Sequence, residues 1–348
     1  MTINSVLTVS DLCTEFTTDD GVVRVLDGVT FHVPKGKTIG LVGESGCGKS
    51  VTAMSIMGLL PKPFGQIVSG SIEYHQVSKT YDLVQLPASE MYRMRGNHIS
   101  MIFQDPMTAL NPVHTIGKQL MEVYQLHQPK LSKKQRYQFA LEMLEKVGIP
   151  SAKQRMLEFP HQLSGGMRQR VMIAIALACE PEVLICDEPT TALDVTVQAQ
   201  ILDLMKSLQQ ETGMSIIFIT HDLGVVAEMC DQVVVMYAGK VVEQADVFEL
   251  FDHPSHPYTQ GLLGSMPNTH SIAKSLLPTI DGSVPNLHEM PTGCRFVTRC
   301  VYQQEKCHQQ SPNLFARNSE HLISCHYWQD LTLNSTAHQS KTKEIENE

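Results

Sequence analysis

The fold of this chain is decided by the stretch Gly43-Glu44-Ser45-Gly46-Cys47-Gly48-Lys49-Ser50. The apolar run Thr38–Val42 before it predicts a buried strand, and Val51–Leu60 after it has the apolar spacing of a helix that stops at Pro61. A glycine-rich loop between a strand and a helix turns its backbone N–H groups onto phosphate oxygens, and the helix N-terminus adds its positive end. The stretch therefore predicts a phosphate-binding loop for a nucleoside triphosphate.

Within this loop the charged and hydroxyl side chains have separate roles. Lys49 would reach the β- and γ-phosphates, and Ser50 would ligate Mg²⁺. We expect the nucleotide to be bound by the whole run and the residue after it: Gly43, Glu44, Ser45, Gly46, Cys47, Gly48, Lys49, Ser50 and Val51.

Composition limits the class of protein. The chain has 348 residues, 42% of them apolar, which is enough for a substantial core and predicts two domains. Its net charge of −9 argues against a nucleic-acid-binding surface over the whole protein. No apolar run approaches the roughly 18 residues of a membrane span, and the N-terminus lacks the features of a secretory signal. We therefore expect a cytosolic location, where the nine cysteines are reduced.

Residues 1–250 have the pattern of one α/β nucleotide-binding domain. Strands are expected at Val6–Phe16 and Val29–Val33, and a hairpin at Val233–Val242. Val183–Cys186 and Ser215–Ile219 are continuous apolar runs, which are typical of parallel strands covered on both faces.

Helices and boundaries follow from other local signals. Ser132 and Gln135 form the pattern of a capping box, and Met167–Cys179 predicts a buried helix. Prolines and histidines increase after residue 250, so residues 251–330 are expected to form a separate C-terminal extension. Residues 331–348 are polar and predict a disordered tail.

Four side chains at expected strand ends point to triphosphate hydrolysis. Asp187 would hold Mg²⁺, and Glu188 would polarise the attacking water as a general base. Gln104 and His221 could sense the γ-phosphate, although a polar strand end and a structural histidine are the alternatives at these two positions.

A second anion-binding helix start occurs at Leu163–Met167, where Ser164, Gly165 and Gly166 open a helix. One nucleotide does not easily use two such sites from one domain. Two chains facing head-to-tail would use both, because each would close its serine-glycine site over the other's ATP. The second site therefore predicts a dimer.

With these motifs in this order, the chain resembles the ABC ATPase family. The resemblance implies a P-loop NTPase fold of the ABC type, with a RecA-like core, antiparallel β and helical subdomains and a small cysteine-containing C-terminal extension. It also implies that Gln104 contacts Mg²⁺ and that Asp194, in the loop Thr191–Asp194, contributes to the nucleotide site. Met167 stands where most signatures carry Gln, and we expect activity to be retained.

A closer resemblance is carried by three further stretches. Phe103–Pro112, Phe159–Gln162 and His256–Thr259 are similar to the peptide-importer branch, the dipeptide and oligopeptide permease ATP-binding subunits. For the adenine ring the family uses an aromatic residue near the first strand. Phe16 is the candidate here, with a core role as the alternative, and Arg24 could also stack on the base.

Four cysteines lie near the C-terminus, at Cys294, Cys300, Cys307 and Cys325. Four thiols in a loop-rich segment predict a metal site, but the tight pairs of a zinc ribbon are missing. The resemblance implies a 4Fe-4S cluster with a structural role. Zinc and four free thiols are the alternatives.

The resulting expectation is an ATPase subunit, bound peripherally to the cytoplasmic face of the inner membrane, that energises an importer of dipeptides or oligopeptides. Its partners would be a second ATPase, paralogous in this branch, two transmembrane permeases and, indirectly, a solute-binding protein. The permeases would dock near Gln104–Leu120 and Phe159–Gln162. Nickel, glutathione, haem or antimicrobial peptides are alternative cargoes, and a soluble ABC ATPase acting on ribosomes or DNA is the alternative class.

Overall fold

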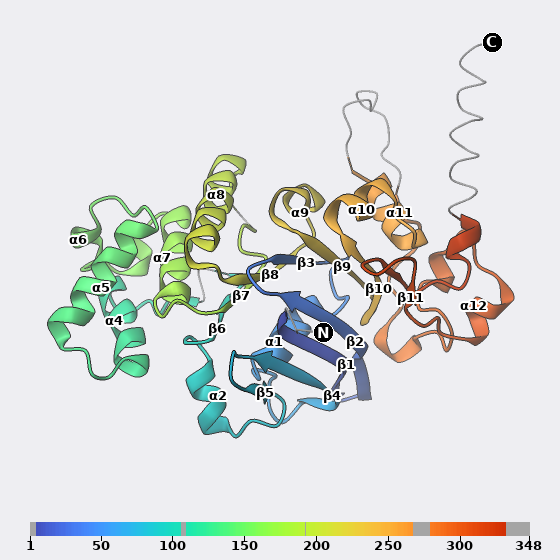
Figure 1. Cartoon of the computed structure of the whole chain (residues 1–348), viewed down its shortest axis with the longest axis horizontal. Helices are drawn as coiled ribbons and strands as arrows, with labels where there is room; N and C mark the ends of the chain where they lie inside the picture. Colours follow the sequence, from blue (N-terminus) through green and yellow to red (C-terminus); the bar gives the residue numbers. More distant parts are fainter. Residues whose placement is uncertain (1–4, 106–108, 192, 267–278, 332–348) are drawn as a thin grey trace, which may run out of the picture.

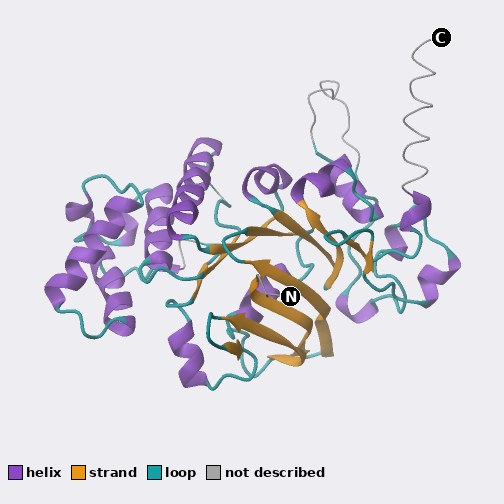
Figure 2. Cartoon of the chain, in the orientation of Figure 1, coloured by secondary structure: helices purple, strands orange, loops and turns teal. Residues whose placement is uncertain are grey.

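Two β-sheets form the centre of the structure, a computed structural model that describes residues 5–105, 109–191, 193–266 and 279–331. The larger sheet has eight strands in the order β11-β12-β10-β9-β3-β8-β7-β6, and the smaller has four in the order β2-β1-β4-β5. Helices cover the larger sheet, and the smaller sheet lies on its other side (Figures 1 and 2).

The strands have the bounds β1 Ser5–Thr18, β2 Gly21–Pro34, β3 Thr38–Val42, β4 Gly65–His75, β5 Thr80–Asp82, β6 Ile99–Ile102, β7 Val183–Asp187, β8 Ser215–Thr220, β9 Gln232–Tyr237, β10 Lys240–Asp246, β11 Phe315–Ala316 and β12 Leu322–Ile323. The α-helices are α1 Lys49–Ile56, α2 Ala88–Met94, α4 Ile116–His127, α5 Lys133–Lys146, α6 Ala152–Arg155, α7 Gly165–Leu177, α8 Val195–Thr212, α9 Leu223–Met229, α10 Val247–Asp252, α11 Pro257–Gly264 and α12 Glu305–Gln309. Three short 3₁₀ helices are η1 Pro160–Gln162, η2 Leu287–Glu289 and η3 Val297–Arg299.

Parallel pairing in the larger sheet brings the predicted site residues together. β3 pairs with β8 and β9, and β7 pairs with β6 and β8, all in parallel. Every residue of β3, β7 and β8 is buried, as the continuous apolar runs predicted. Because the carboxyl ends of parallel strands meet on one side of a sheet, the loops after β3, β6, β7 and β8 lie close together.

Helices α4, α5 and α6 form a helical region to one side of the sheet, next to α7 (Figure 1). The capping box that opens α5 is present: the Ser132 side chain accepts from the Gln135 N–H, and the Gln135 side chain accepts from the Ser132 N–H. Leu120, Leu144 and Val171 are fully buried where these helices pack together.

Several predicted boundaries were wrong, and two of the differences have a clear physical cause. Helix α1 ends at Ile56 rather than at Leu60, because Gly58 has a φ of +60°, a left-handed conformation that ends an α-helix. Strand β2 begins at Gly21 rather than at Val29, because Val22 and Val23 still pair antiparallel with β1, right up to the turn that joins the two strands.

The C-terminal part contributes strands to the larger sheet. In β12, Leu322 and Ile323 pair antiparallel with Gln244 and Glu243 of β10, and β11 pairs with β12. Through these strands the described C-terminal part shares the larger sheet with the nucleotide-binding part. The predicted disordered tail lies outside the described residues, apart from Leu331.

Candidate functional site

The phosphate loop leads from β3 into α1, as predicted. Gly48 has a φ of +104° and precedes the first turn of α1, while Gly43 has a φ of +149°. A side chain at Gly43 would collide with the carbonyl oxygen of Met236, so the loop lies too close to β9 for any other residue. Lys49 is buried, and its Nζ donates to the carbonyl oxygens of Gly43 (2.7 Å) and Glu44 (3.1 Å).

Two of the three predicted magnesium ligands meet across the sheet, while the third, Gln104, donates to Glu188. The Ser50 hydroxyl donates to Oδ1 of Asp187 at 3.0 Å, and Asp187 is only 5% exposed. Burial raises the pKa of Asp187, although the hydrogen bond from Ser50 opposes this. A hydroxyl and a buried carboxylate are oxygen donors of the kind that Mg²⁺ prefers.

Glu188 is the centre of a hydrogen-bonded group. Its carboxylate accepts from the Gln104 amide (3.2 Å) and the Thr191 hydroxyl (3.0 Å), and Nδ1 of His221 lies 3.3 Å away. Burial alone would raise the pKa of Glu188, but the hydrogen bonds from Thr191 and His221 outweigh it and the pKa is lowered. The carboxylate is therefore ionised at neutral pH, as a general base requires.

Three of these four residues were predicted from the sequence to act at the γ-phosphate, whereas Thr191 was not predicted as a partner of the base. The signal was its position three residues after Glu188, within reach of the same carboxylate. Gln104 makes a direct hydrogen bond to Glu188, which an ordinary polar residue at a strand end would not need to do.

The second predicted anion site lies at the start of α7. Ser164 caps the helix by accepting from the Met167 N–H, and both Ser164 and Gly165 are exposed. An added Cβ on Gly165 would meet nothing within 4 Å, so this helix start is open to another molecule. Asp194 instead caps α8, since its Oδ1 accepts from the Val197 N–H at 2.9 Å.

The two candidates for adenine stacking lie on the smaller sheet. Phe16 is half-buried and packs against Gly65, where an added Cβ would approach the ring to 2.9 Å. Arg24 is exposed and pairs with Glu15 at 2.8 Å and Asp27 at 3.3 Å. Stacking on either residue stays a prediction.

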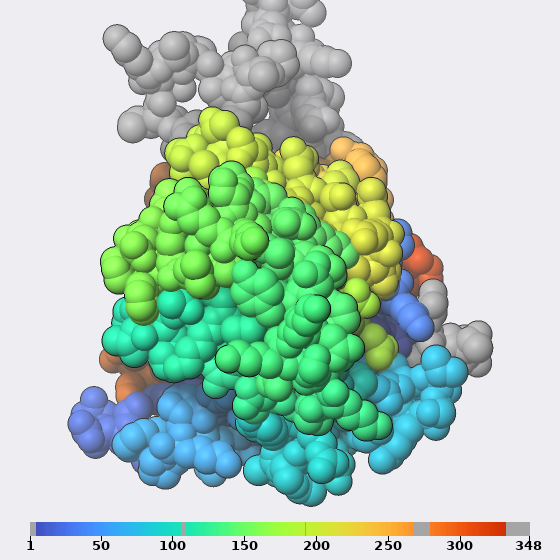
Figure 3. Space-filling model, turned by 90° about the vertical axis from the view of Figure 1, so that its left-hand side faces the viewer, coloured from blue at the N-terminus to red at the C-terminus, as the bar shows by residue number. Residues whose placement is uncertain are grey.

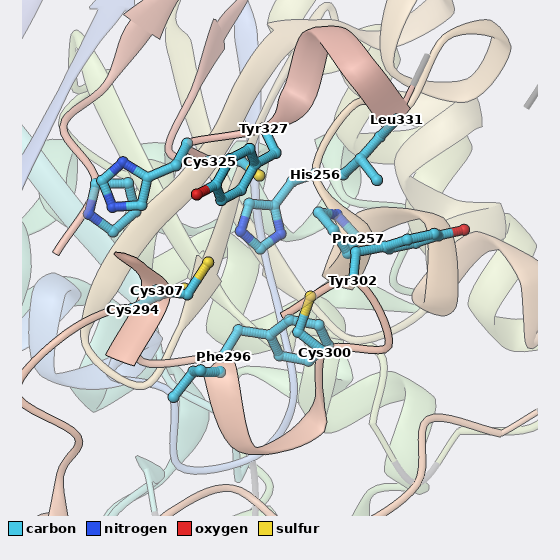
Figure 4. Close-up of a pocket in the computed structure, with 13 residues that line it drawn as sticks. His256, Pro257, Cys294, Phe296, Cys300, Tyr302, Cys307, Cys325, Tyr327 and Leu331 are labelled. Carbon is cyan, nitrogen blue, oxygen red and sulfur yellow. The ribbon is translucent and has the colours of Figure 1, made fainter. Parts of the chain in front are cut away.

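The four C-terminal cysteines line one cavity of about 20 Å³, together with apolar and aromatic side chains (Figure 4). Burial raises the pKa of Cys300 to about 11 and that of Cys325 to about 12. A space of this size holds about one water molecule. Within residues 5–105, 109–191, 193–266 and 279–331, no three His, Cys, Asp or Glu side chains are grouped to hold a single metal ion.

A groove lies beside helix α4 on the predicted docking face. It has a volume of about 390 Å³ and is lined by residues of β6, the loop before α4, α4 itself and α7, among them Met101, His114 and Val123. Phe103 and Val113 are exposed apolar side chains of the same part of the chain. Figure 3 looks onto the helical region. None of the described helices has both the length and the apolar character needed to cross a membrane.

Comparison with known proteins agrees with this geometry. Residues 26–191 match the ABC transporter family, and residues 242–307 match the oligopeptide/dipeptide transporter C-terminal region. A probable peptide ABC transporter ATP-binding protein of Sinorhizobium fredii is 50% identical over 92% of this chain and 94% of its own. The dipeptide transport ATP-binding protein DppD of Bacillus subtilis is 50% identical over 93% of this chain and 95% of its own.

Solved structures show the same cassette fold. A dimeric structure of MJ0796, described as a bacterial ABC transporter cassette, covers 69% of this chain and 98% of its own, with a TM-score of 0.61 and 25% identity. CbiO1 of Clostridium perfringens covers 72% of this chain and 92% of its own, with a TM-score of 0.59 and 29% identity. The chain therefore belongs to the ABC transporter ATP-binding proteins, in the family of the dipeptide and oligopeptide transport subunits.

Proposed function

We propose that this chain hydrolyses ATP to drive the import of dipeptides or oligopeptides through separate membrane subunits. The observation that carries the hydrolytic part is the ionised Glu188, held by Gln104, Thr191 and His221 beside the Ser50–Asp187 pair. The peptide cargo is supported by the relatives, which are named as peptide transport proteins across nearly the whole chain.

In this proposal the loop from Gly43 to Val51 binds the phosphates through its backbone N–H groups, and Lys49 contacts the β- and γ-phosphates. Glu188 accepts a proton from the attacking water, and His221 and Gln104 orient the γ-phosphate and the water. Ser50, Asp187 and Gln104 would hold Mg²⁺, which neutralises the charge that develops on the phosphate oxygens.

The exposed start of α7 supports a head-to-tail dimer, in which Ser164, Gly165 and Gly166 of one chain bind the γ-phosphate held by the other. Asp194 would lie at the same contact. A paralogous ATPase is the proposed partner. Two identical chains would use the same geometry.

An arginine at Ser164 is expected to block this contact. In a Glu188→Gln background with Mg-ATP, Ser164→Arg should weaken dimerisation more than about tenfold, since a bulky side chain fills an anion site that needs close backbone approach. The dimerisation constant is measured by analytical ultracentrifugation in the presence of the partner ATPase. Ser132→Arg is the matched control, because Ser132 is also an exposed N-cap and lies outside the predicted contact. Equal dimerisation of both variants would contradict the head-to-tail arrangement.

We also propose that residues 251–330 form the extension of this branch and that Cys294, Cys300, Cys307 and Cys325 hold a 4Fe-4S cluster. Four thiols around one largely apolar cavity form the donor set of such a cluster. Zinc is the alternative, and in the described residues no three ligands are grouped around one point for either kind of centre. Because the cavity is small, cluster binding requires the cysteine segments to move apart.

Replacing Cys300 with serine tests the cluster. We expect anaerobically purified wild-type protein to be coloured and to contain iron and sulfide, and Cys300→Ser to lose most of both, because one of four ligands is removed. Cys179→Ser is the control, since Cys179 lies outside this cavity. If the wild-type protein is colourless and contains zinc, the cluster proposal is wrong and the four cysteines form a zinc site.

Peripheral binding at the cytoplasmic face of the membrane completes the proposal, with two permeases docked at the groove beside α4. The deciding experiment reconstitutes this chain with its partner ATPase, permeases and solute-binding protein in proteoliposomes. ATP-dependent uptake of a labelled dipeptide supports the proposal. Uptake of nickel, haem or glutathione instead would change the cargo, and hydrolysis without any uptake would overturn the importer role.

A further inference from the structure

Two arginines adjoin cysteines of the cavity: Arg295 follows Cys294, and Arg299 precedes Cys300. The side chains of both arginines reach the nucleotide-binding part of the chain. Each of them is nearly buried, with 10% exposure for Arg295 and 4% for Arg299. Buried arginines are rare unless they are paired, so their partners show what this segment holds in place.

Arg299 binds the phosphate loop directly. Its Nη1 donates to both carboxylate oxygens of Glu44, at 3.1 and 2.9 Å. Its Nε and Nη2 donate to the backbone carbonyls of Asp281 (3.0 Å) and Ile280 (3.1 Å). The planar guanidinium is thus fixed on the extension side and presents its remaining donor to the loop.

An aromatic group surrounds this contact and joins it to the cysteine cavity. The buried Tyr258 hydroxyl accepts from the Glu44 N–H at 2.8 Å, so Glu44 is held by both side chain and backbone. The Tyr258 ring lies 4.7 Å from that of Tyr237 and 5.5 Å from that of Phe296. Phe296 also lines the cysteine cavity (Figure 4), so one ring contacts both sites.

Arg295 makes a second connection at the other end of the loop. It donates to Oδ2 of Asp27 at 2.8 Å and to the carbonyl oxygen of Ala238. The next residue, Gly239, donates its N–H to the carbonyl oxygen of Cys47 at 2.9 Å. The segment between the two cysteines therefore supports the phosphate loop on both sides of Ser45 and Gly46.

We propose that Arg299 is a positioning residue for the phosphate loop, and that the segment 294–300 sets the affinity for ATP through it. Glu44 and Cys47 lie within the loop Gly43–Val51, whose backbone N–H groups would bind the phosphates, so fixing these two residues constrains the direction of the donors. By linkage, ATP must stabilise the segment by the same factor by which the segment favours ATP. The inference rests on the loop binding ATP and holds whether or not the cavity contains a metal.

Replacing Arg299 with methionine in the full-length chain tests this role. The Kd for a fluorescent ATP analogue with Mg²⁺ should rise about tenfold, because a hydrogen-bonded charge that orients the loop is lost. At saturating ATP, kcat should change less than twofold, since Glu188 and its partners are untouched. Arg299→Lys should recover only part of the affinity, because it keeps the charge but loses the Nε and Nη2 donors that fix the guanidinium. Arg317→Met is the control: Arg317 lies in the same extension but pairs with Glu249 of α10, and its replacement should leave the Kd unchanged.

A double-mutant cycle and hydrogen exchange separate positioning from general destabilisation. Glu44→Gln should raise the Kd by a similar factor. Adding Arg299→Met should raise the Kd little further, because both changes remove the same Arg299–Glu44 contact. Mg-ATP should slow hydrogen exchange of residues 294–300 in the wild-type chain but not in Arg299→Met.

Three outcomes overturn the inference: an unchanged Kd in a folded Arg299→Met protein, an equal loss in Arg317→Met, or additive effects in the cycle. If Arg299→Met does not fold, Glu44→Gln and Arg299→Lys decide by the same criteria. Iron loss in Cys300→Ser with normal ATP binding in Arg299→Met would support the cluster and reject this inference, so the two proposals fail separately.

Discussion

Replacing Glu188 with glutamine is expected to lower kcat for ATP hydrolysis about a thousandfold, because general-base catalysis contributes factors of this order. The lowered pKa of Glu188 means that the wild-type carboxylate is already ionised at neutral pH and can accept the proton of water. An amide of the same shape cannot accept it. The Kd for Mg-ATP should stay within about twofold, since Lys49 and Ser50, which bind the phosphates and the metal, are unchanged.

Phosphate release under single-turnover conditions measures this effect, with the partner ATPase present. Glu182→Gln is the control, because Glu182 lies before the other end of β7 and its carboxylate lies 3.6 Å from Nδ1 of His98 near the surface. A Glu188→Gln protein that turns over ATP within tenfold of wild type would exclude Glu188 as the general base and leave His221 to be tested in that role.

Lys49→Ala is expected to raise the Kd for ATP about a hundredfold. One ammonium bound to two phosphate groups makes charge-assisted hydrogen bonds of roughly 1.5–3 kcal/mol each, and a tenfold change in Kd corresponds to about 1.4 kcal/mol. The side chain lies at the start of α1 and is buried, so water replaces it poorly. Equilibrium binding of radiolabelled ATP provides the measurement.

The matched control is Lys37→Ala, on the approach to β3. Its ammonium pairs with Asp231 at 2.7 Å on the surface, where an ion pair contributes little. ATP binding should not change. If both lysine variants bind ATP alike and melt at the wild-type temperature, the glycine-rich loop is not the nucleotide site.

The part of the site that the sequence predicted is local. A strand, a glycine loop and a helix follow one another within residues 38–56, and Asp187 directly follows a buried run, so short patterns were enough. Parallel pairing then explains why Gln104, Glu188 and His221 come together, since each follows a strand of the same sheet.

The remainder depends on contacts between distant residues. Arg299 and Glu44 are 255 positions apart, and no periodicity or spacing connects them. Tyr258 was part of a stretch that indicated the peptide branch, but its hydrogen bond to the Glu44 N–H could only be seen in the folded structure. The end of α1 at Ile56 was also missed, because the apolar spacing continues to Leu60 while the left-handed backbone at Gly58 does not continue the helix.

The pairing of β12 with β10 has a consequence for shortened chains. A cassette cut after residue 250 would leave β10 at the sheet margin with unpaired N–H and C=O groups, which are a template for intermolecular association. The truncation would also remove His321, which lies 2.7 Å from the buried carboxylate of Glu243. If such a fragment aggregates, the cause would be the exposed edge of β10 and the unpaired Glu243 carboxylate, and not the loss of a separately folding domain.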